Sequence, residues 1–200
     1  MGRRSDHSRE ELTNLILDAA WNIAESDGLS GLTARHIADK IGYAPGTIYN
    51  LFDDLDELIL QVRGRTLDLL YDELASLPQN GEPARDLLAL GRGYIEFTRS
   101  HPNLWNVTLD HHVPRDTMPN WYHDKALRLF DLLESALAPL FENDDAREAA
   151  LAAQVIWSSL HGIYQLQSAG KLIEPESLDD MTQLLIECFV DGLRYKKKAP

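Results

Sequence analysis

Apolar residues recur every three or four positions along most of this chain, which is the spacing of one face of an α-helix. Ser8 and Glu11 precede the first such face and fit a capping box, in which each side chain binds the other residue's backbone N–H. Gly28 follows Asp27 and predicts the end of this helix, because glycine adopts a left-handed conformation at low cost. The face itself comprises Leu12, Leu15, Ile16, Ala19, Ala20, Ile23 and Ala24.

Two short helices are predicted next. Thr33 is a suitable N-cap for a helix that runs to residue 41, Gly42 interrupts it, and Pro45 fits the first turn of a helix that ends at residue 51 or 52. Further helices are expected over about 54–77, 84–100, 103–110, 119–138, 145–169 and 178–196, with Pro139 ending or kinking one of them. The pattern contains no convincing strand. It predicts an all-α fold of about nine helices, with a three-helix unit over 1–53 and a helical bundle over 54–200.

The stretch from Thr33 to Phe52 combines two short helices that meet at Gly42, and Ala38 is small where they must approach closely. The core that sets their crossing angle is expected to contain Ile37, Ile41, Ile48 and Phe52. This is the arrangement of a helix-turn-helix, whose second helix enters the major groove of DNA. The spacing alone also fits an ordinary helical corner with a glycine turn.

Composition narrows the class of protein. The chain has 200 residues, of which 44% are hydrophobic, and no apolar run is long enough to span a membrane. The polar N-terminus lacks the apolar segment of a signal peptide, so a cytoplasmic protein is expected. A single cysteine, Cys188, excludes an internal disulfide and is expected to act as a small buried hydrophobe rather than as a reactive thiol.

The net charge of −13 argues at first sight against a nucleic-acid partner. The first 64 residues hold 6 Lys and Arg against 11 Asp and Glu, and the remainder holds 13 against 21. DNA binding must therefore rest on the motif and on local positive charge. That charge is available from Arg3, Arg4, Arg9, Arg35 and Lys40.

Residues 8–58 resemble the N-terminal domain of the TetR family of regulators. The resemblance lies in the apolar face of the first helix, and in Gly28-Leu29, Leu32-Thr33, Ile37-Ala38, Ile41-Gly42, the run Gly46–Phe52 and Asp56-Glu57-Leu58. A second run, Ile156–Gly162, is similar to one in a subset of these regulators. The resemblance favours the helix-turn-helix over the simple corner, and it implies a ligand-responsive repressor that binds double-stranded DNA.

The resemblance also assigns roles to residues. Thr33 is expected to cap the second helix and bind a phosphate, and Tyr49 is expected to bind a phosphate from the recognition helix. The residues expected to face the floor of the groove are Tyr43, Ala44, Pro45, Gly46 and Thr47, and Arg35 and Asn50 complete the expected DNA-binding set.

The sequence departs from the family pattern close to that surface. Many members have His where Leu51 stands, Lys where Leu55 stands and Ser where Ala44 stands. Asp53 and Asp54 add negative charge nearby. These changes favour weaker binding to the phosphate backbone and leave the fold expectation intact.

In this family the C-terminal bundle usually binds an effector, and the last two helices form the dimer interface. The final predicted helix carries a broad apolar stripe, and its expected interface residues are Leu185, Cys188 and Phe189. A two-fold homodimer presents two recognition helices, so a palindromic operator is expected.

An effector pocket is expected from large or polar-tipped side chains on the middle helices, with plain core packing as the alternative for each. These side chains are Trp105, Trp121, Tyr122, Phe130, Trp157, His161, Tyr164 and Gln165. His161 is expected to be a hydrogen-bonded core histidine, and Gly162 to permit close approach of another helix. Few basic residues are present on these helices, so a neutral or cationic effector is expected.

Other functions have weaker support. His111 and His112, with His101 and His123 nearby, lack the helical spacing of a metal site, so neither a metal nor a cofactor is expected. No P-loop or Gly-x-Ser-x-Gly motif is present, and the chain is not expected to be an enzyme. The alternative function is a helical ligand-binding or interaction module with weak or lost DNA binding, which the acidic balance favours.

Overall fold

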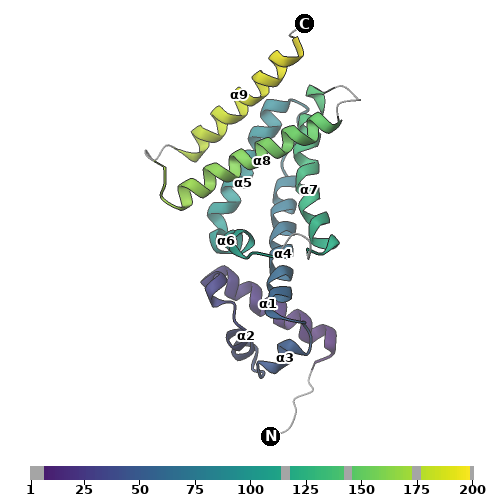
Figure 1. Ribbon diagram of the computed structural model, residues 1–200, viewed down its shortest axis with the longest axis vertical. Helices are drawn as coiled ribbons and strands as arrows, with labels where there is room; N and C mark the ends of the chain where they lie inside the picture. The colour runs from purple at the N-terminus through teal and green to yellow at the C-terminus, as the bar shows by residue number, and fades with distance from the viewer. Residues whose placement is uncertain (1–6, 114–117, 142–145, 173–176, 199–200) are drawn as a thin grey trace. The chain divides into compact units, whose positions relative to one another are not determined.

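A computed structural model describes residues 7–113, 118–141, 146–172 and 177–198. Within these ranges the chain forms nine α-helices, two short 3-10 turns and no strand (Figure 1), which confirms the predicted all-α class. The helices are α1 (Arg9–Asp27), α2 (Ala34–Ile41), α3 (Gly46–Tyr49), α4 (Leu55–Ala75), α5 (Pro83–Ser100), α6 (Pro102–Asp110), α7 (Asn120–Leu137), α8 (Ala146–Ser168) and α9 (Leu178–Lys198). The 3-10 turns are η1 (Leu29–Gly31) and η3 (Ala138–Leu140).

The chain divides into two compact units. The first comprises the chain up to Leu69 together with Ser100–His123, and the second comprises Leu70–Arg99 and the chain from Asp124 onward. The boundary expected after residue 53 therefore falls inside the first unit. Helix α6, which is distant from the helix-turn-helix in sequence, belongs to the same unit as α1, α2 and α3.

The start of α1 follows the predicted capping box. The Ser8 hydroxyl accepts from the Glu11 backbone N–H at 3.2 Å, and the Glu11 carboxylate accepts from the Ser8 N–H at 2.6 Å. The bond from the Ser8 backbone N–H to the carboxylate holds the pKa of Glu11 below its ordinary value, because it favours the charged form. Gly28, with φ of +67°, follows the last residue of the helix as predicted.

The first unit is organised around one apolar core. The predicted residues Ile37 and Ile48 are both fully buried there, Phe52 is 5% exposed, and Ile41 packs against them from a partly buried position. The core also includes residues from outside the helix-turn-helix: Ile16, Ala20 and Ile23 of α1, Leu58 and Val62 of α4, and Leu104 and Val107 of α6. Burial of these side chains against α1 and α6 stabilises the small α2–α3 unit, which is too short to bury a core alone.

Two predicted helix ends can be compared with the structure. The third helix spans only Gly46–Tyr49, shorter than the predicted 45–52. The chain is tightly wound around this helix, because the backbone N–H groups of Thr47, Ile48, Asn50 and Leu51 bond to carbonyls three residues back rather than four. Pro139 ends α7 as predicted, and the chain continues there as the 3-10 turn η3.

The second unit contains α5, α8 and α9, and two of these helices approach closely at Gly91 of α5. A Cβ at Gly91 would lie 2.9 Å from Cγ2 of Thr182 on α9, which is too close for any larger residue. The close approach predicted at Gly162 does not occur among the described residues. Apart from its chain neighbours and the backbone of α8, no described atom lies within 4 Å of the position that its Cβ would take.

Candidate nucleic-acid interface

Helix α2 is fixed at both ends by local bonds. Thr33 accepts the His36 backbone N–H at 3.2 Å, as expected for an N-cap, and this leaves the hydrogen of its hydroxyl available for another acceptor. At the other end Gly42 has φ of +76°, and its N–H and that of Tyr43 bond to the carbonyls of Asp39 and Ala38. This pair of bonds is a Schellman motif, and it sets the sharp turn between α2 and α3.

The short helix α3 buries one residue and exposes most of its neighbours. Ile48 points into the core and is fully buried, whereas the Tyr49 side chain is 54% exposed. Thr33, Arg35, Ala44, Pro45, Gly46 and Asn50 are also exposed, and Tyr43 and Thr47 are half-buried. Every residue of the expected DNA-binding set therefore has surface that a ligand could contact.

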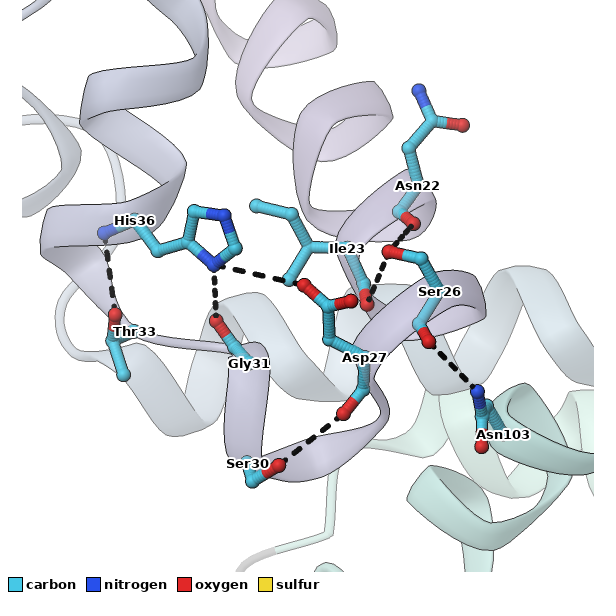
Figure 2. Close-up of polar contacts among 9 residues, drawn as sticks. All are labelled: Asn22, Ile23, Ser26, Asp27, Ser30, Gly31, Thr33, His36 and Asn103. Atoms are coloured by element: carbon cyan, nitrogen blue, oxygen red, sulfur yellow. Dashed lines mark hydrogen bonds and ion pairs between the residues drawn. The ribbon is translucent and has the colours of Figure 1, made fainter.

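The corner between α1 and α2 holds α2 in place (Figure 2). Nδ1 of His36 lies 3.1 Å from the carbonyl oxygen of Gly31 and 4.0 Å from Oδ2 of Asp27. A backbone carbonyl only accepts, so Nδ1 carries the proton and donates to Gly31. The imidazole on α2 is thus bonded to the turn that follows α1.

Positive charge at this surface is sparse. Arg35 is highly exposed and lies 3.9 Å from Asp39 one helical turn away, so part of its charge is neutralised locally. Lys40 and Arg9 are exposed as well, and Arg3 and Arg4 lie outside the described residues. His7 adds a contact that the sequence did not predict, because its Nδ1 lies 2.8 Å from the Tyr43 hydroxyl.

The start of α4 explains the departures from the family pattern. Leu51 and Leu55 are partly buried and pack against the apolar core of the first unit, so they contribute to stability at the two positions where the family resemblance favoured His and Lys. Asp54 accepts the Glu57 backbone N–H at 2.7 Å, and Glu57 accepts that of Asp53 at 2.7 Å. These carboxylates cap α4 favourably, and they also place negative charge next to the recognition helix.

The expected effector residues are divided between the two units. Trp105, Trp121 and Tyr122 belong to the first unit, and Phe130, Trp157, His161, Tyr164 and Gln165 belong to the second. Within the second unit, Trp157 lies 5.9 Å from Phe130 and stacks on His161, with ring centroids 6.0 Å apart. Tyr94, which the sequence pattern did not single out, joins this cluster.

Tyr94 is 2% exposed and lies at the centre of the aromatic cluster. Its ring centroid is 5.2 Å from that of Trp157 and 6.4 Å from that of Tyr164, and its hydroxyl oxygen is 3.1 Å from Nδ1 of His161. His161 is therefore hydrogen-bonded, as predicted, and partial burial lowers its pKa below the ordinary value. An apolar cavity beside the cluster has a volume of about 10 Å³, enough for one water molecule, and of the eight expected residues only Trp157 lines it.

The expected interface residues of α9 lie on an open groove of about 440 Å³. Leu185, Cys188 and Phe189 line it together with Ile163, Met181 and Leu184. Cys188 is exposed, so the expectation that it is buried is wrong. The reason is that α9 has two apolar sides: Ile186 and Val190 are fully buried, whereas Cys188 lies on the groove side.

Neither a metal centre nor a membrane helix emerges from the described residues. They contain no cluster of three or more His, Cys, Asp or Glu that could hold a metal ion. His111, one of the histidines considered for such a site, instead lies 2.9 Å from Oδ1 of Asp56 and 3.4 Å from Nη1 of Arg63. No described helix is long and apolar enough to cross a membrane.

An exposed helix-turn-helix followed by a larger set of helices defines a class of DNA-binding regulators. Comparison with known sequences gives the family. The profile described as "Bacterial regulatory proteins, tetR family" matches residues 16–62, and the one described as "Tetracyclin repressor-like, C-terminal domain" matches residues 87–189. The chain belongs to the TetR family of transcriptional regulators and is a DNA-binding regulator.

One curated relative has a matching description, and solved structures of low sequence identity show the same fold. The HTH-type transcriptional regulator YobS of Bacillus subtilis is 25% identical over 186 residues, which cover 92% of this chain and 93% of the relative. Among solved structures, a protein of unknown function from Rhodococcus sp. RHA1 has a TM-score of 0.74 at 19% identity and covers 96% of this chain and 98% of its own. The TetR-family regulator PfmR of Thermus thermophilus has a TM-score of 0.57 at 15% identity, over 89% and 98% of the two chains.

Proposed function

We propose that this regulator is a homodimeric, ligand-responsive repressor that binds a palindromic operator. The observation that carries the proposal is that one chain has two exposed surfaces of different kinds. One is the helix-turn-helix, and the other is the apolar groove on α9 lined by Leu185, Cys188 and Phe189. Membership in a family of transcriptional regulators supports a role without catalysis.

In the proposed complex the exposed hydroxyls contact the DNA backbone. Thr33, whose oxygen already accepts from His36, donates its hydrogen to a phosphate, and Tyr49 donates from the other side of the turn. Such contacts fix the register without reading sequence. Base discrimination falls to Tyr43, Thr47 and the small residues between them, with apolar contact to thymine methyl groups as one mechanism.

The dimer interface is proposed for the outer sides of α8 and α9, which pack against each other within the chain. On α9, Ile186 and Val190 face the chain's own core, so the groove residues form a second apolar stripe that no described part of the chain covers. Leu184 of that stripe is 63% exposed, and Leu151 of α8 is 60% exposed. Gly162 has no side chain to cover the backbone of α8, which allows a helix from a second copy of the chain to approach closely there.

Light scattering tests the assembly. We expect the wild-type protein to have twice the 22.6 kDa mass of one chain. Phe189→Glu places a charge in the groove and should give monomers or aggregates that have also lost operator binding. Asp191→Glu, an exposed position on the same helix, is the control. A stable wild-type monomer at micromolar concentration would contradict the proposed dimer.

The effector is proposed to be a small apolar or aromatic molecule, neutral or cationic, that binds beside Trp157. The burial that lowers the pKa of His161 favours the neutral imidazole, and a neutral His–Tyr94 pair can both donate and accept hydrogen bonds. The present cavity of about 10 Å³ is far below the roughly 300 Å³ of a typical ligand pocket. Binding must therefore displace side chains, and this displacement links the ligand to a change in conformation.

A fluorescence screen of neutral and cationic aromatic compounds tests the effector site, followed by operator affinity with and without each hit. His161→Ala and Trp157→Phe should reduce the response to the ligand and leave operator binding intact. If both variants lose operator binding without any ligand, the aromatic cluster is structural core and the proposed site is wrong.

A second function, a helical interaction module with weak DNA binding, is favoured by the carboxylates of Asp53, Asp54, Asp56 and Glu57 at the start of α4. An electrophoretic shift against genomic fragments at low salt separates the two functions. Retention of a discrete fragment supports the repressor, and no retention at any protein concentration supports the interaction module.

A further inference from the structure

The end of α1 depends on partners from outside the helix. The last carbonyl groups of an α-helix have no donor within the helix and need donors from elsewhere. The Ala24 carbonyl accepts from Gly28 N–H at 3.0 Å, and the Asp27 carbonyl accepts from the Ser30 hydroxyl at 3.2 Å. Both donors are local. They leave the two carbonyls between them, those of residues 25 and 26, to be satisfied by another part of the chain.

These two carbonyls are capped by one side chain of α6. The amide Nδ2 of Asn103 donates to the Glu25 carbonyl at 2.9 Å and to the Ser26 carbonyl at 3.1 Å, and Figure 2 shows it reaching the end of α1. Nδ1 of His101 also lies 3.6 Å from the Glu25 carboxylate. The last turn of α1 contains no basic residue of its own, so its C-terminal cap is supplied by the start of α6.

The capped turn is connected on its other side to the helix-turn-helix. Asp27 and Gly31 both approach His36 of α2, at 4.0 Å and 3.1 Å from its Nδ1. The spacing there is tight, because a Cβ on Gly31 would lie 2.6 Å from Cβ of Asp27. The turn that follows α1 is therefore linked to α2 by the hydrogen bond between the His36 side chain and the Gly31 carbonyl, which Figure 2 shows beside Asp27.

We propose that Asn103 is a positioning residue for DNA binding. From α6 it holds the last turn of α1, and through Asp27, Gly31 and His36 that turn sets the orientation of α2 and of its N-cap Thr33. The inference rests on the proposed phosphate contact of Thr33. Asn103 itself touches the end of α1 on the side away from His36, so it acts on DNA through this corner and not by contact.

The discriminating variant is Asn103→Asp. It keeps the shape of the side chain but replaces the N–H donors with a charged oxygen that faces two carbonyls at the negative end of the α1 dipole. The matched control is Asn22→Asp, which makes the same chemical change on α1. The Asn22 side chain is exposed and points away from the Ser26–Asn103 contact in Figure 2.

The assay uses the full-length protein and a 30-base-pair duplex that the wild type selects from a randomised pool, with affinity measured over a series of KCl concentrations. Asn103→Asp should bind about tenfold more weakly. Its plot of log affinity against log salt should also be shallower, by about 0.9 for each phosphate that the variant no longer binds. The control should match the wild type apart from a small uniform effect of its charge.

The salt slope separates positioning from simple instability. A variant that is only less folded has fewer active molecules, so its affinity falls while its slope stays that of the wild type. Weaker affinity with an unchanged salt slope would overturn the inference. It would also be overturned if Asn103→Asp bound like the wild type, or if Asn103→Asp and Asn22→Asp had equal effects.

A readout without DNA distinguishes failure of the inference from failure of the proposed DNA surface. Hydrogen exchange of the backbone amides of residues 28–38 should be faster in Asn103→Asp than in either the wild type or Asn22→Asp, because the corner is loosened. If the wild type selects no duplex, the proposed DNA contacts fail. Unchanged exchange in the variant would then refute the positioning role on its own.

Discussion

Arg63 on α4 is a buried cation. Removing its charge by substitution should not destabilise the fold, whereas removing a hydrogen-bond partner of the charge should. Its side chain is 6% exposed, and the guanidinium lies 4.8 Å from the ring centroid of Tyr122. Burial raises the pKa of Tyr122, so the phenol stays neutral and gives Arg63 no counter-charge. Nη1 lies 3.4 Å from Nδ1 of His111, and arginine can only donate, so the proton of His111 is on Nε2 and faces Asp56.

The two variants are His111→Ala and Arg63→Met. The first removes the Nδ1 atom of His111 as an acceptor for the buried guanidinium, which should cost about 2 kcal/mol of unfolding free energy. The second removes the charge together with Nε, which has no partner among the described residues, and keeps an apolar stem of similar length. It loses a cation–π contact of about 1 kcal/mol but avoids the desolvation of a guanidinium. We expect a net change between zero and about 1 kcal/mol of stabilisation.

Urea unfolding followed by circular dichroism measures both, with the m-value as a check that the unfolding reaction is unchanged. His111→Ala should destabilise the Arg63→Met background less than the wild type, because only the loss of the imidazole packing and of its bond to Asp56 remains there. If Arg63→Met is destabilised as much as His111→Ala, the guanidinium contributes net stability and this reasoning is wrong.

Three further outcomes follow from single sites. The Thr182 hydroxyl is fully buried with no partner among the described residues, so Thr182→Val should raise the unfolding free energy by about 1 kcal/mol, and a lower melting temperature would contradict this. Because burial lowers the pKa of His161, the unfolded chain takes up this proton first as the pH falls. Stability should therefore decline below about pH 6.5, and less steeply in His161→Gln in matched thermal scans. Tyr49→Phe should weaken binding equally across operator variants, whereas Thr47→Ala should change base preference; a Tyr49→Phe effect confined to one base pair would exclude the phosphate role.

Local chemistry made much of the first unit predictable. The Ser8 capping box, the Thr33 cap and the turn at Gly42 each depend on residues within a few positions of one another, and all three occur as predicted. The length of the third helix was not predicted, because the backbone N–H groups of Asn50 and Leu51 bond three residues back, and the sequence pattern does not specify this. Propensity carries no information on this choice of bonds.

Contacts between residues far apart in the sequence could not be predicted from it. Asn103 follows a proline at the start of a short helix, and nothing in that segment indicates that its amide caps a helix end far earlier in the chain. The aromatic residues of the middle helices were chosen by type and spacing, so residues of both units were placed in one expected pocket. Tyr94 was left out, although it is the residue around which Trp157 and His161 are arranged.

The contribution of α6 to the core beneath α2 and α3 bears on how such regulators can be recombined. Leu104 is fully buried and Val107 is 1% exposed, both in the same core as Ile37 and Ile48. A chimera joined after residue 53 would transfer the helix-turn-helix without the α6 residues that complete its core. The α6 segment of the recipient protein would then have to pack in their place. Exchange of DNA specificity between members should therefore succeed when the α6 segment travels with the reader, or when only the exposed residues of α3 are grafted. In this chain the inheritable module is discontinuous, and a crossover in evolution that respects it needs three junctions, after residues 69, 99 and 123, rather than one.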